Sequence, residues 1–197
     1  MTYTIHPGKK DAIATANVAD IGCVLWGTTY TPKTTFRAVF DEQKGFYFLL
    51  TCCEKDPRIT YLTPGGEVCE DSCMEVFLNF APEKTHDYIN FEMNAAGAYL
   101  FGVGSDRNDR RELHTRHRPT VTPLKESDRW SVLLFIPLET ITEIYGPLSF
   151  TSGTTFVGNA FKCGDLTPSP HFLSWAPMQE DAVDFHRFDR FGTFVIA

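Results

Sequence analysis

Apolar side chains recur at every second position in several short runs of this chain, which is the period of a half-buried β-strand. One run covers residues 70–80 and a second covers residues 88–94. In the first run the apolar face consists of Met74, Val76, Leu78 and Phe80. In the second run it consists of Ile89, Phe91 and Met93. The pattern predicts two strands that each present one face to a core.

The opposite faces of these two runs carry most of the polar groups. The first run places Cys73, Glu75, Phe77 and Asn79 there. The second run places Tyr88, Asn90, Glu92 and Asn94 there. If the runs pair as a hairpin, carboxylates, amides and aromatic rings gather on one sheet face, and we expect Glu75 and Glu92 to point the same way. The alternative interpretation is the solvated outer face of a sandwich.

Strand patterns continue along most of the chain and helical patterns are scarce. Further strands are expected at Thr35–Phe40, Gly45–Cys53, Ala98–Val103, Trp130–Pro137, Thr155–Cys163 and Thr193–Ala197. The spacing predicts a helix of about two turns over 138–145, ended by Gly146-Pro147, and one short turn over 12–19. Many strands separated by Gly, Pro and Asn turns predict an all-β fold. We expect one domain over residues 1–197, a two-sheet antiparallel β-sandwich of the immunoglobulin-like or jelly-roll-like kind with one or two short helices.

Two irregular stretches interrupt the strand pattern. Residues 105–118 carry five arginines and two histidines, which suggests a solvated loop or, alternatively, one that contacts an anion. Residues 164–190 are rich in proline and aromatic residues. A loop of that length in a compact domain usually has a function.

Composition narrows the possible partners. The formal net charge of −7 argues against nucleic acid, because phosphate binding needs a basic surface. No apolar run approaches the length that spans a bilayer, so we expect no membrane partner. The first ten residues lack the apolar region of a signal peptide. We therefore expect a cytoplasmic protein, or an extracellular one if a leader was removed.

Six cysteines are present, and they form no Cys-x-x-Cys pair. Cys69 and Cys73 are four residues apart, a poor match to a structural zinc site. Reduced and mostly buried thiols are the expected state.

Five short motifs occur in a characteristic order. They are Asp71-Ser72-x-x-Glu75, Asn94-x-x-Gly97, His171-x-x-Ser174-Trp175-x-Pro177, Phe185-His186 and Phe191-Gly192. Together they resemble the carbohydrate-binding module family 9-like domains, over roughly Thr35 to Ala197. The resemblance implies a β-sandwich that holds sugars or the ends of sugar chains through stacked aromatic rings with carboxylate and amide hydrogen bonds.

The resemblance also implies particular residues. Trp175 is the most similar to a sugar-stacking tryptophan of the family. A second stacking tryptophan is expected shortly before the Glu-Asp-Ser motif, where this chain has Tyr61 and Val68. Some members carry structural calcium, so calcium is possible here, with Glu70 and Asp71 as a beginning of a site. No other cofactor is expected.

We therefore expect non-catalytic binding of a saccharide or related polyol, with a small set of ligand-binding residues. Trp175 is the stacking platform, and the polar partners are Glu75, Glu92, Asn94, Asn159 and His171. Each also has a structural interpretation: loop packing for Trp175 and a hydrogen-bonded loop histidine for His171. Trp130 and Trp26 are expected to be structural.

Two other functions remain open. One is a sugar-active enzyme that uses the carboxylates of Glu75 and Glu92. The chain has no Gly-x-Ser-x-Gly elbow, phosphate-binding glycine loop or dinucleotide fingerprint. The other is a structural or interaction domain without a small ligand. The oligomeric state is not predicted by any of these patterns.

Overall fold

The computed structural model describes residues 1–178 and 183–197, and β-strands account for most of its regular structure. One group of strands is β2 (Ala19–Asp20), β4 (Thr34–Asp41), β5 (Gly45–Cys52), β10 (Thr120–Lys125) and β11 (Trp130–Pro137). A second group is β3 (Cys23–Val24), β6 (Cys73–Asn79), β7 (Tyr88–Asn94), β8 (Tyr99–Gly104), β9 (Arg111–Glu112), β12 (Thr155–Cys163), β13 (Phe172–Ser174) and β14 (Gly192–Ile196). The last strand is β1 (Thr2–Pro7). The helical elements are α1 (Leu138–Tyr145) and three 3₁₀ turns, η1 (Lys10–Thr15), η2 (Val68–Glu70) and η3 (Phe188–Arg190).

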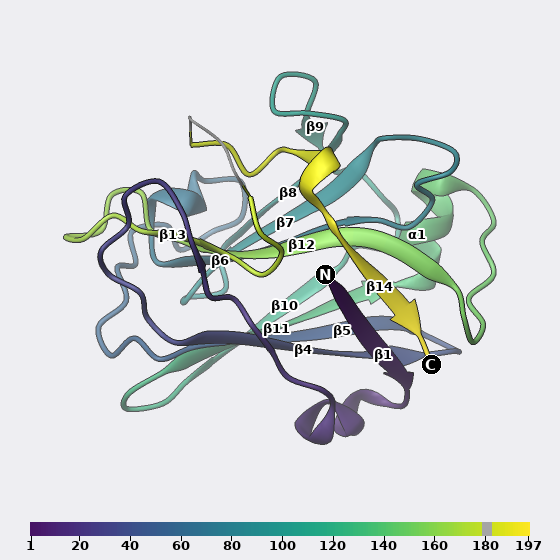
Figure 1. Cartoon of the computed structure of the whole chain (residues 1–197), viewed down its shortest axis with the longest axis horizontal. Helices are drawn as coiled ribbons and strands as arrows, with labels where there is room; N and C mark the ends of the chain where they lie inside the picture. Colours follow the sequence, from purple (N-terminus) through teal and green to yellow (C-terminus); the bar gives the residue numbers. More distant parts are fainter. Residues whose placement is uncertain (179–182) are drawn as a thin grey trace.

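The two groups of strands form two layers that face each other (Figure 1). The strand order runs β10-β11-β5-β4-β1-β14-β12-β6-β7-β8-β9 without a break. β1 connects the layers because it pairs in parallel with β14 on one side and with β4 on the other. The expected β-architecture is present, but as one curled, mixed sheet. The expectation of antiparallel pairing is wrong at β1. Its two parallel pairings join the layers along one side of the sandwich.

Most element bounds match the sequence pattern, and α1 matches the predicted helix residue for residue. The sequence pattern did not predict the two- and three-residue strands β2, β3, β9 and β13. It also missed two six-residue strands, β1 and β10. Both have mixed polar composition, and β10 is an edge strand with exposed side chains and a central proline, Pro123. Proline is tolerated at an edge because the ladder hydrogen bond it lacks is not needed there. The short turn near the N-terminus is η1, two residues earlier than expected.

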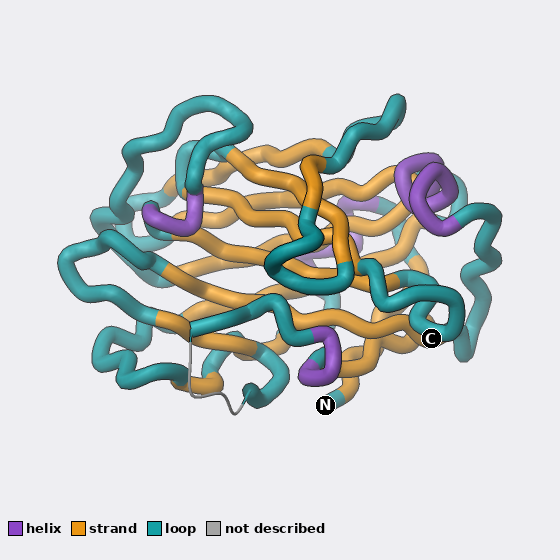
Figure 2. Tube along the Cα trace, turned by 90° about the horizontal axis from the view of Figure 1, so that it is seen from above, coloured by secondary structure: helices purple, strands orange, loops and turns teal. Residues whose placement is uncertain are grey.

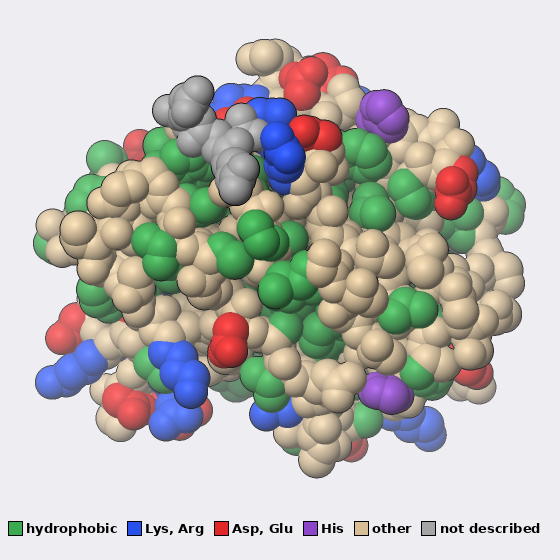
Figure 3. All heavy atoms as spheres, viewed as in Figure 1, with side chains coloured by type: hydrophobic (Ala, Val, Ile, Leu, Met, Phe, Trp, Pro, Cys, Tyr) green, Lys and Arg blue, Asp and Glu red, His purple; other side chains and the backbone are tan. Residues whose placement is uncertain are grey.

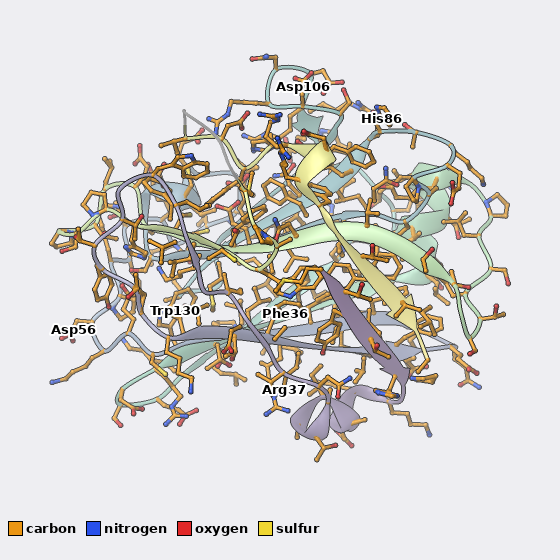
Figure 4. All side chains as sticks on the ribbon, viewed as in Figure 1. Phe36, Arg37, Asp56, His86, Asp106 and Trp130 are labelled. Atoms are coloured by element: carbon orange, nitrogen blue, oxygen red, sulfur yellow. The ribbon has the colours of Figure 1, made fainter. Side chains whose placement is uncertain are left out.

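The main core fills the space between the two layers. Alternation along β4 shows how it forms: Phe36 points between the layers and is fully buried, whereas Arg37 points away (Figure 4). Trp130, at the start of β11, is also fully buried in this core, as expected. The inward apolar faces of β6 and β7 lie here too. This core holds the strands that carry the polar face.

The opposite face of β6 and β7 is not solvated. It carries a second apolar cluster that includes Phe77, Tyr88 and Phe161, and loop residues Leu25 and Phe185 pack onto it. Loop segments cross over the strands in the view of Figure 2. The interpretation of this face as a solvated outer surface is therefore wrong: loop residues such as Leu25 and Phe185 bury it. The same cover gives the polar residues of that face a surrounding of low polarity.

All six cysteines are free thiols in the structure. In the view of Figure 3, hydrophobic side chains are scattered over the surface. No helix among the described residues is both long enough and apolar enough to span a membrane.

Trp175 belongs to the main core. Its indole is 3% exposed and lies 5.5 Å from the ring of Phe36 and 5.0 Å from that of Phe194, measured between centroids. A Cβ atom at Gly192 would come within 2.7 Å of the indole, so glycine there makes room for it. This burial contradicts the expectation that Trp175 is a sugar-stacking platform, because an indole that is 3% exposed offers no surface to a sugar.

Replacing this indole should therefore destabilise the fold. We expect Trp175→Ala to lower the free energy of unfolding by roughly 3–5 kcal/mol through the cavity it leaves, and the melting temperature by roughly 10 °C. Leu62→Ala is a matched control, because Leu62 is 74% exposed, and its stability should stay within about 0.5 kcal/mol of the wild type. Equal melting temperatures of the Trp175 variant and the control would contradict the packing role.

Candidate functional site

Glu75 and Glu92 lie directly opposite each other on the neighbouring strands β6 and β7. Both carboxylates lie on the same sheet face, as the alternation predicts, and they are 3% and 4% exposed. Beside them is a pocket of about 100 Å³. Its walls are formed by Glu67, Cys69, Glu75, Glu92, Arg107, Arg110, Cys163, Asp165, Phe172, Val183, Phe185 and His186.

Arg110 comes from the arginine-rich segment and turns inward to the two carboxylates. Its Nη1 donates to Glu92 Oε1 at 2.6 Å. The arginine reaches this position because its side chain lies over Gly102 of β8, where a Cβ atom would come within 2.9 Å of Arg110 Cγ. Gly104, on the same face of β8, leaves room for the backbone of Arg110. The two glycines thus allow a cation to lie flat against the sheet.

His186 is fixed between two partners. Arg110 Nη1 is 3.2 Å from His186 Nε2, and Tyr88 Oη is 2.7 Å from Nδ1. Arginine can only donate, so Nε2 accepts and the ring proton is on Nδ1, where it faces the tyrosine oxygen. Burial, followed by the charge of Arg110, lowers the pKa of His186 to about 3. A neutral imidazole therefore helps hold Arg110 in place.

Asn90 orients Glu92 from the same strand. Its Nδ2 donates to Glu92 Oε1 at 2.8 Å. Its Oδ1 is the buried side-chain atom of the described residues that has no hydrogen-bond partner, and it lies at Gly102. An unpaired buried oxygen costs free energy. The amide nevertheless keeps this orientation, in which its nitrogen bonds the carboxylate of Glu92.

Burial and mutual repulsion set the protonation of the two carboxyls. Burial raises the pKa of Glu92 to about 6, although the charge and hydrogen bond of Arg110 oppose the shift. Burial, and then the charge of Glu92, raises the pKa of Glu75 well above its usual range. The thiol of Cys163 donates to Glu75 Oε1 at 2.9 Å. The pocket thus pairs ionised Glu92 with Arg110 and favours protonated Glu75.

The other predicted polar residues lie outside this pocket, and the structure corrects the expectation that they join it. Asn94 donates to Asp71 Oδ2 and to the backbone oxygen of Tyr61. Asn159 bonds the backbone nitrogen and oxygen of Ala176. Each amide is fully buried and positions a turn or loop. Asn94 and Asn159 therefore have structural roles.

His171 is likewise buried away from the two carboxylates. Its Nε2 is 2.6 Å from Lys162 Nζ, and its Nδ1 is 2.9 Å from the backbone oxygen of Ser169. Burial, followed by the charge of Lys162, lowers the pKa of His171 to about 4. This imidazole is a satisfied loop histidine.

Asp71 does not offer a calcium site. Its two oxygens accept hydrogen bonds from the backbone nitrogens of Thr60 and Tyr61, from the amide of Asn94 and from the guanidinium of Arg58 at 2.7 Å. Calcium needs several convergent oxygen ligands. Here N–H donors and a cation surround the carboxylate instead, so the residues present do not fit the ion.

Several residues of the pocket escaped the sequence reading. Arg110, Cys163 and Phe172 reach it through loop geometry or strand register. The arginine-rich segment and the Phe185-His186 motif were visible signals. Neither indicates which arginine turns inward, because that depends on the glycines of β8.

A larger groove adjoins the pocket along β8 and β9. Its volume is about 470 Å³. Its walls are formed by Pro64, Gly65, Tyr99, Leu100, Phe101, Gly102, Arg110, Arg111, Glu112, Leu113, Thr115, Arg118 and Pro119. Arg110 is common to both cavities, so this residue lies where the two meet.

The two-layer β-fold with a loop-covered polar pocket defines a β-sandwich binding module. The profile of carbohydrate-binding family 9 matches residues 9–196. The chain therefore belongs to carbohydrate-binding family 9. No curated protein matches it significantly.

Solved structures show the same fold. A candidate carbohydrate-binding protein from Bacteroides uniformis ATCC 8492 superposes with a TM-score of 0.84 at 23% identity, covering 100% of this chain and 99% of that one. A family 9 module from Caldicellulosiruptor kristjanssonii in complex with glucose gives a TM-score of 0.75 at 10% identity, with 100% and 96% covered. The cellotriose complex from that organism gives 0.73 at 10% identity, with 100% and 93% covered.

The raised pKa of Glu92 predicts a pH-dependent stability difference. The folded state favours the protonated form of Glu92. The stability that Glu92 contributes is therefore complete below its pKa in the unfolded chain, about 4.5, and is lost as the pH rises through about 6. Glu92→Gln resembles the protonated form and does not titrate. We compare the free energy of unfolding of variant and wild type, measured with denaturant at pH 4 and at pH 8. The difference in favour of the variant should be larger at pH 8 by on the order of 2 kcal/mol.

The buried histidines His171 and His186 change the free energy of unfolding in the opposite direction. Their pKa values are lowered in the folded state, so the fold becomes more stable as the pH rises. They are present in both proteins, so the difference between variant and wild type removes their contribution. A difference independent of pH would contradict the raised pKa of Glu92.

Proposed function

We propose that this protein binds a saccharide, without converting it, in the pocket beside Glu75 and Glu92. The observation that carries this proposal is the buried carboxylate pair with Arg110 fixed against it. Such groups form charge-assisted hydrogen bonds, which are stronger than neutral ones. They are also held in place before a ligand arrives, which reduces the entropy lost on binding.

Family membership supports the class of ligand. Two family 9 structures from Caldicellulosiruptor kristjanssonii were solved in complex with sugars, one with glucose and one with cellotriose. The pocket of about 100 Å³ suits one end or edge of a sugar ring. The groove of about 470 Å³ offers room for a further unit of a chain, with Arg110 between the two. A chain end seated in the pocket with its remainder in the groove fits this arrangement.

In this proposal the half-buried ring of Phe172 replaces Trp175 as the ring that faces a sugar, and the buried ring of Phe185 lies beside it. Phe172 and Phe185 line the pocket. The indole of Trp26 is 5.6 Å from the ring of Phe172 and 5.2 Å from that of Phe185, so it supports both. Sugars combine hydroxyl edges with apolar C–H faces, and a wall of rings beside carboxylates offers a surface for each.

Glycoside hydrolysis is the second candidate function. It is favoured by the raised pKa of both carboxyls, since a general acid in this chemistry must remain protonated near neutral pH. The two side chains face each other across adjacent strands, where Cβ atoms are about 4.5–5.5 Å apart. Both carboxylates are held by protein hydrogen bonds, which favours their use in binding.

Arg110 provides the sharpest test of binding. We expect Arg110→Met to weaken the affinity for a bound glycan roughly tenfold or more, because a hydrogen bond to a charged group contributes about 1.5–3 kcal/mol. Arg129→Met is the matched control: Arg129 is exposed, is paired with Asp128 and lines neither cavity, and its variant should bind like the wild type. The measurement is calorimetric titration with glucose, cellotriose and the glycans selected by an array, with melting curves of each variant.

Two results would overturn the proposal. One is the absence of binding to any glycan on the array by the wild-type protein. The other is equal affinity of the Arg110 and Arg129 variants. Release of reducing sugar by the wild type, abolished in Glu75→Gln or Glu92→Gln with binding retained, would establish the enzymatic alternative instead.

A further inference from the structure

Two cysteines and one carboxylate form a compact cluster on the polar face of β6 and β12. Cys73 pairs directly with Cys163 at the end of the ladder between these strands. Glu75 follows Cys73 by two residues and therefore points to the same face. One ligand atom of each residue lies within 4.8 Å of the other two, and all three side chains are buried. We propose that these three residues bind a thiophilic divalent metal ion such as zinc.

The distances suit a tetrahedral ion. A zinc–sulfur bond of about 2.3 Å puts two coordinating sulfurs about 3.8 Å apart. The largest separation within the cluster is below 4.8 Å, so small side-chain rotations close the gap. Cys163 Sγ and Glu75 Oε1 are already 2.9 Å apart, with the thiol proton between them. The ion takes the place of that proton and draws the third ligand inward.

The donor set selects the kind of ion. Two sulfurs disfavour calcium and magnesium, which take oxygen ligands. Thiolates with one carboxylate suit zinc and related soft ions. Binding displaces the two thiol protons and the carboxyl proton of Glu75 to solvent, and no atom is oxidised or reduced. The complex then carries one net negative charge, on the side of the pocket where Arg110 lies.

The pocket gives the ion a route in. Cys163 and Glu75 both line it, so an ion can reach the cluster from solvent without unfolding of the sheet. Three protein ligands leave one position of a tetrahedral ion for water or another small ligand. The pocket, which Cys163 and Glu75 line, provides the space for that ligand.

The test uses reduced, metal-free protein without any sugar, so its outcome does not depend on the proposed saccharide binding. Cadmium(II) is titrated as a probe for zinc, and the sulfur-to-cadmium charge-transfer absorption is followed in the ultraviolet. We expect saturation at one ion per chain with the intensity of two thiolates. Zinc at 100 times its dissociation constant should stabilise the fold by about 2.7 kcal/mol, measured as a rise in melting temperature.

Variants identify the ligands. Cys73→Ser and Cys163→Ser should abolish tight binding and the rise in melting temperature. Cys52→Ser is the matched buried control, and Cys53→Ser the exposed one; both should bind like the wild type. Glu75→Gln should keep the two-thiolate absorption and lose affinity at least tenfold.

Several outcomes would overturn the proposal. These are no saturable absorption in the wild type, unchanged binding by Cys163→Ser, the intensity of three thiolates, or wild-type affinity in Glu75→Gln. Melting curves without metal report whether each variant folds. If Cys73→Ser does not fold, Cys163→Ser and Glu75→Gln decide the question.

Discussion

The site depends on keeping two carboxylates buried side by side. Glu75 and Glu92 repel each other and lose their hydration, and ionised groups in that position are costly unless they are paired. Arg110 compensates one charge, and protonation of Glu75 lowers the cost of the other. Cys163 and Asn90 complete the hydrogen bonds to the pair. These contacts offset the free energy of burying the two carboxyl groups before any ligand binds. The pocket is therefore already organised for polar recognition.

This arrangement requires both the glycines of β8 and the loops that cover the face. Gly102 lets Arg110 lie against the sheet, and His186 holds the guanidinium from the covering loop. Phe185 closes the cover by stacking on Phe161, with ring centroids 4.1 Å apart. Without the cover, water would solvate the carboxylates and their pKa values would return toward the usual range.

Membership in carbohydrate-binding family 9 does not by itself place the ligand. The tryptophan that most resembles a stacking residue is core, and the aspartate that could begin a calcium site is surrounded by N–H donors. In this chain several of the motifs are structural elements. Carboxylates, an arginine and a thiol meet at one pocket instead.

The local pattern by itself determined most of the longer strands, α1 and the shared face of Glu75 and Glu92, because strand and helix periods are properties of consecutive residues. It could not determine that β1 joins the layers in parallel, since that pairing connects residues far apart in the chain. Nor could it distinguish a loop tryptophan from a core one: Trp175 follows a short strand, and only Phe36, Phe194 and Gly192 make its place a core position. Cys73 and Cys163 meet for the same reason, since a register between distant strands is set by packing of the whole sandwich.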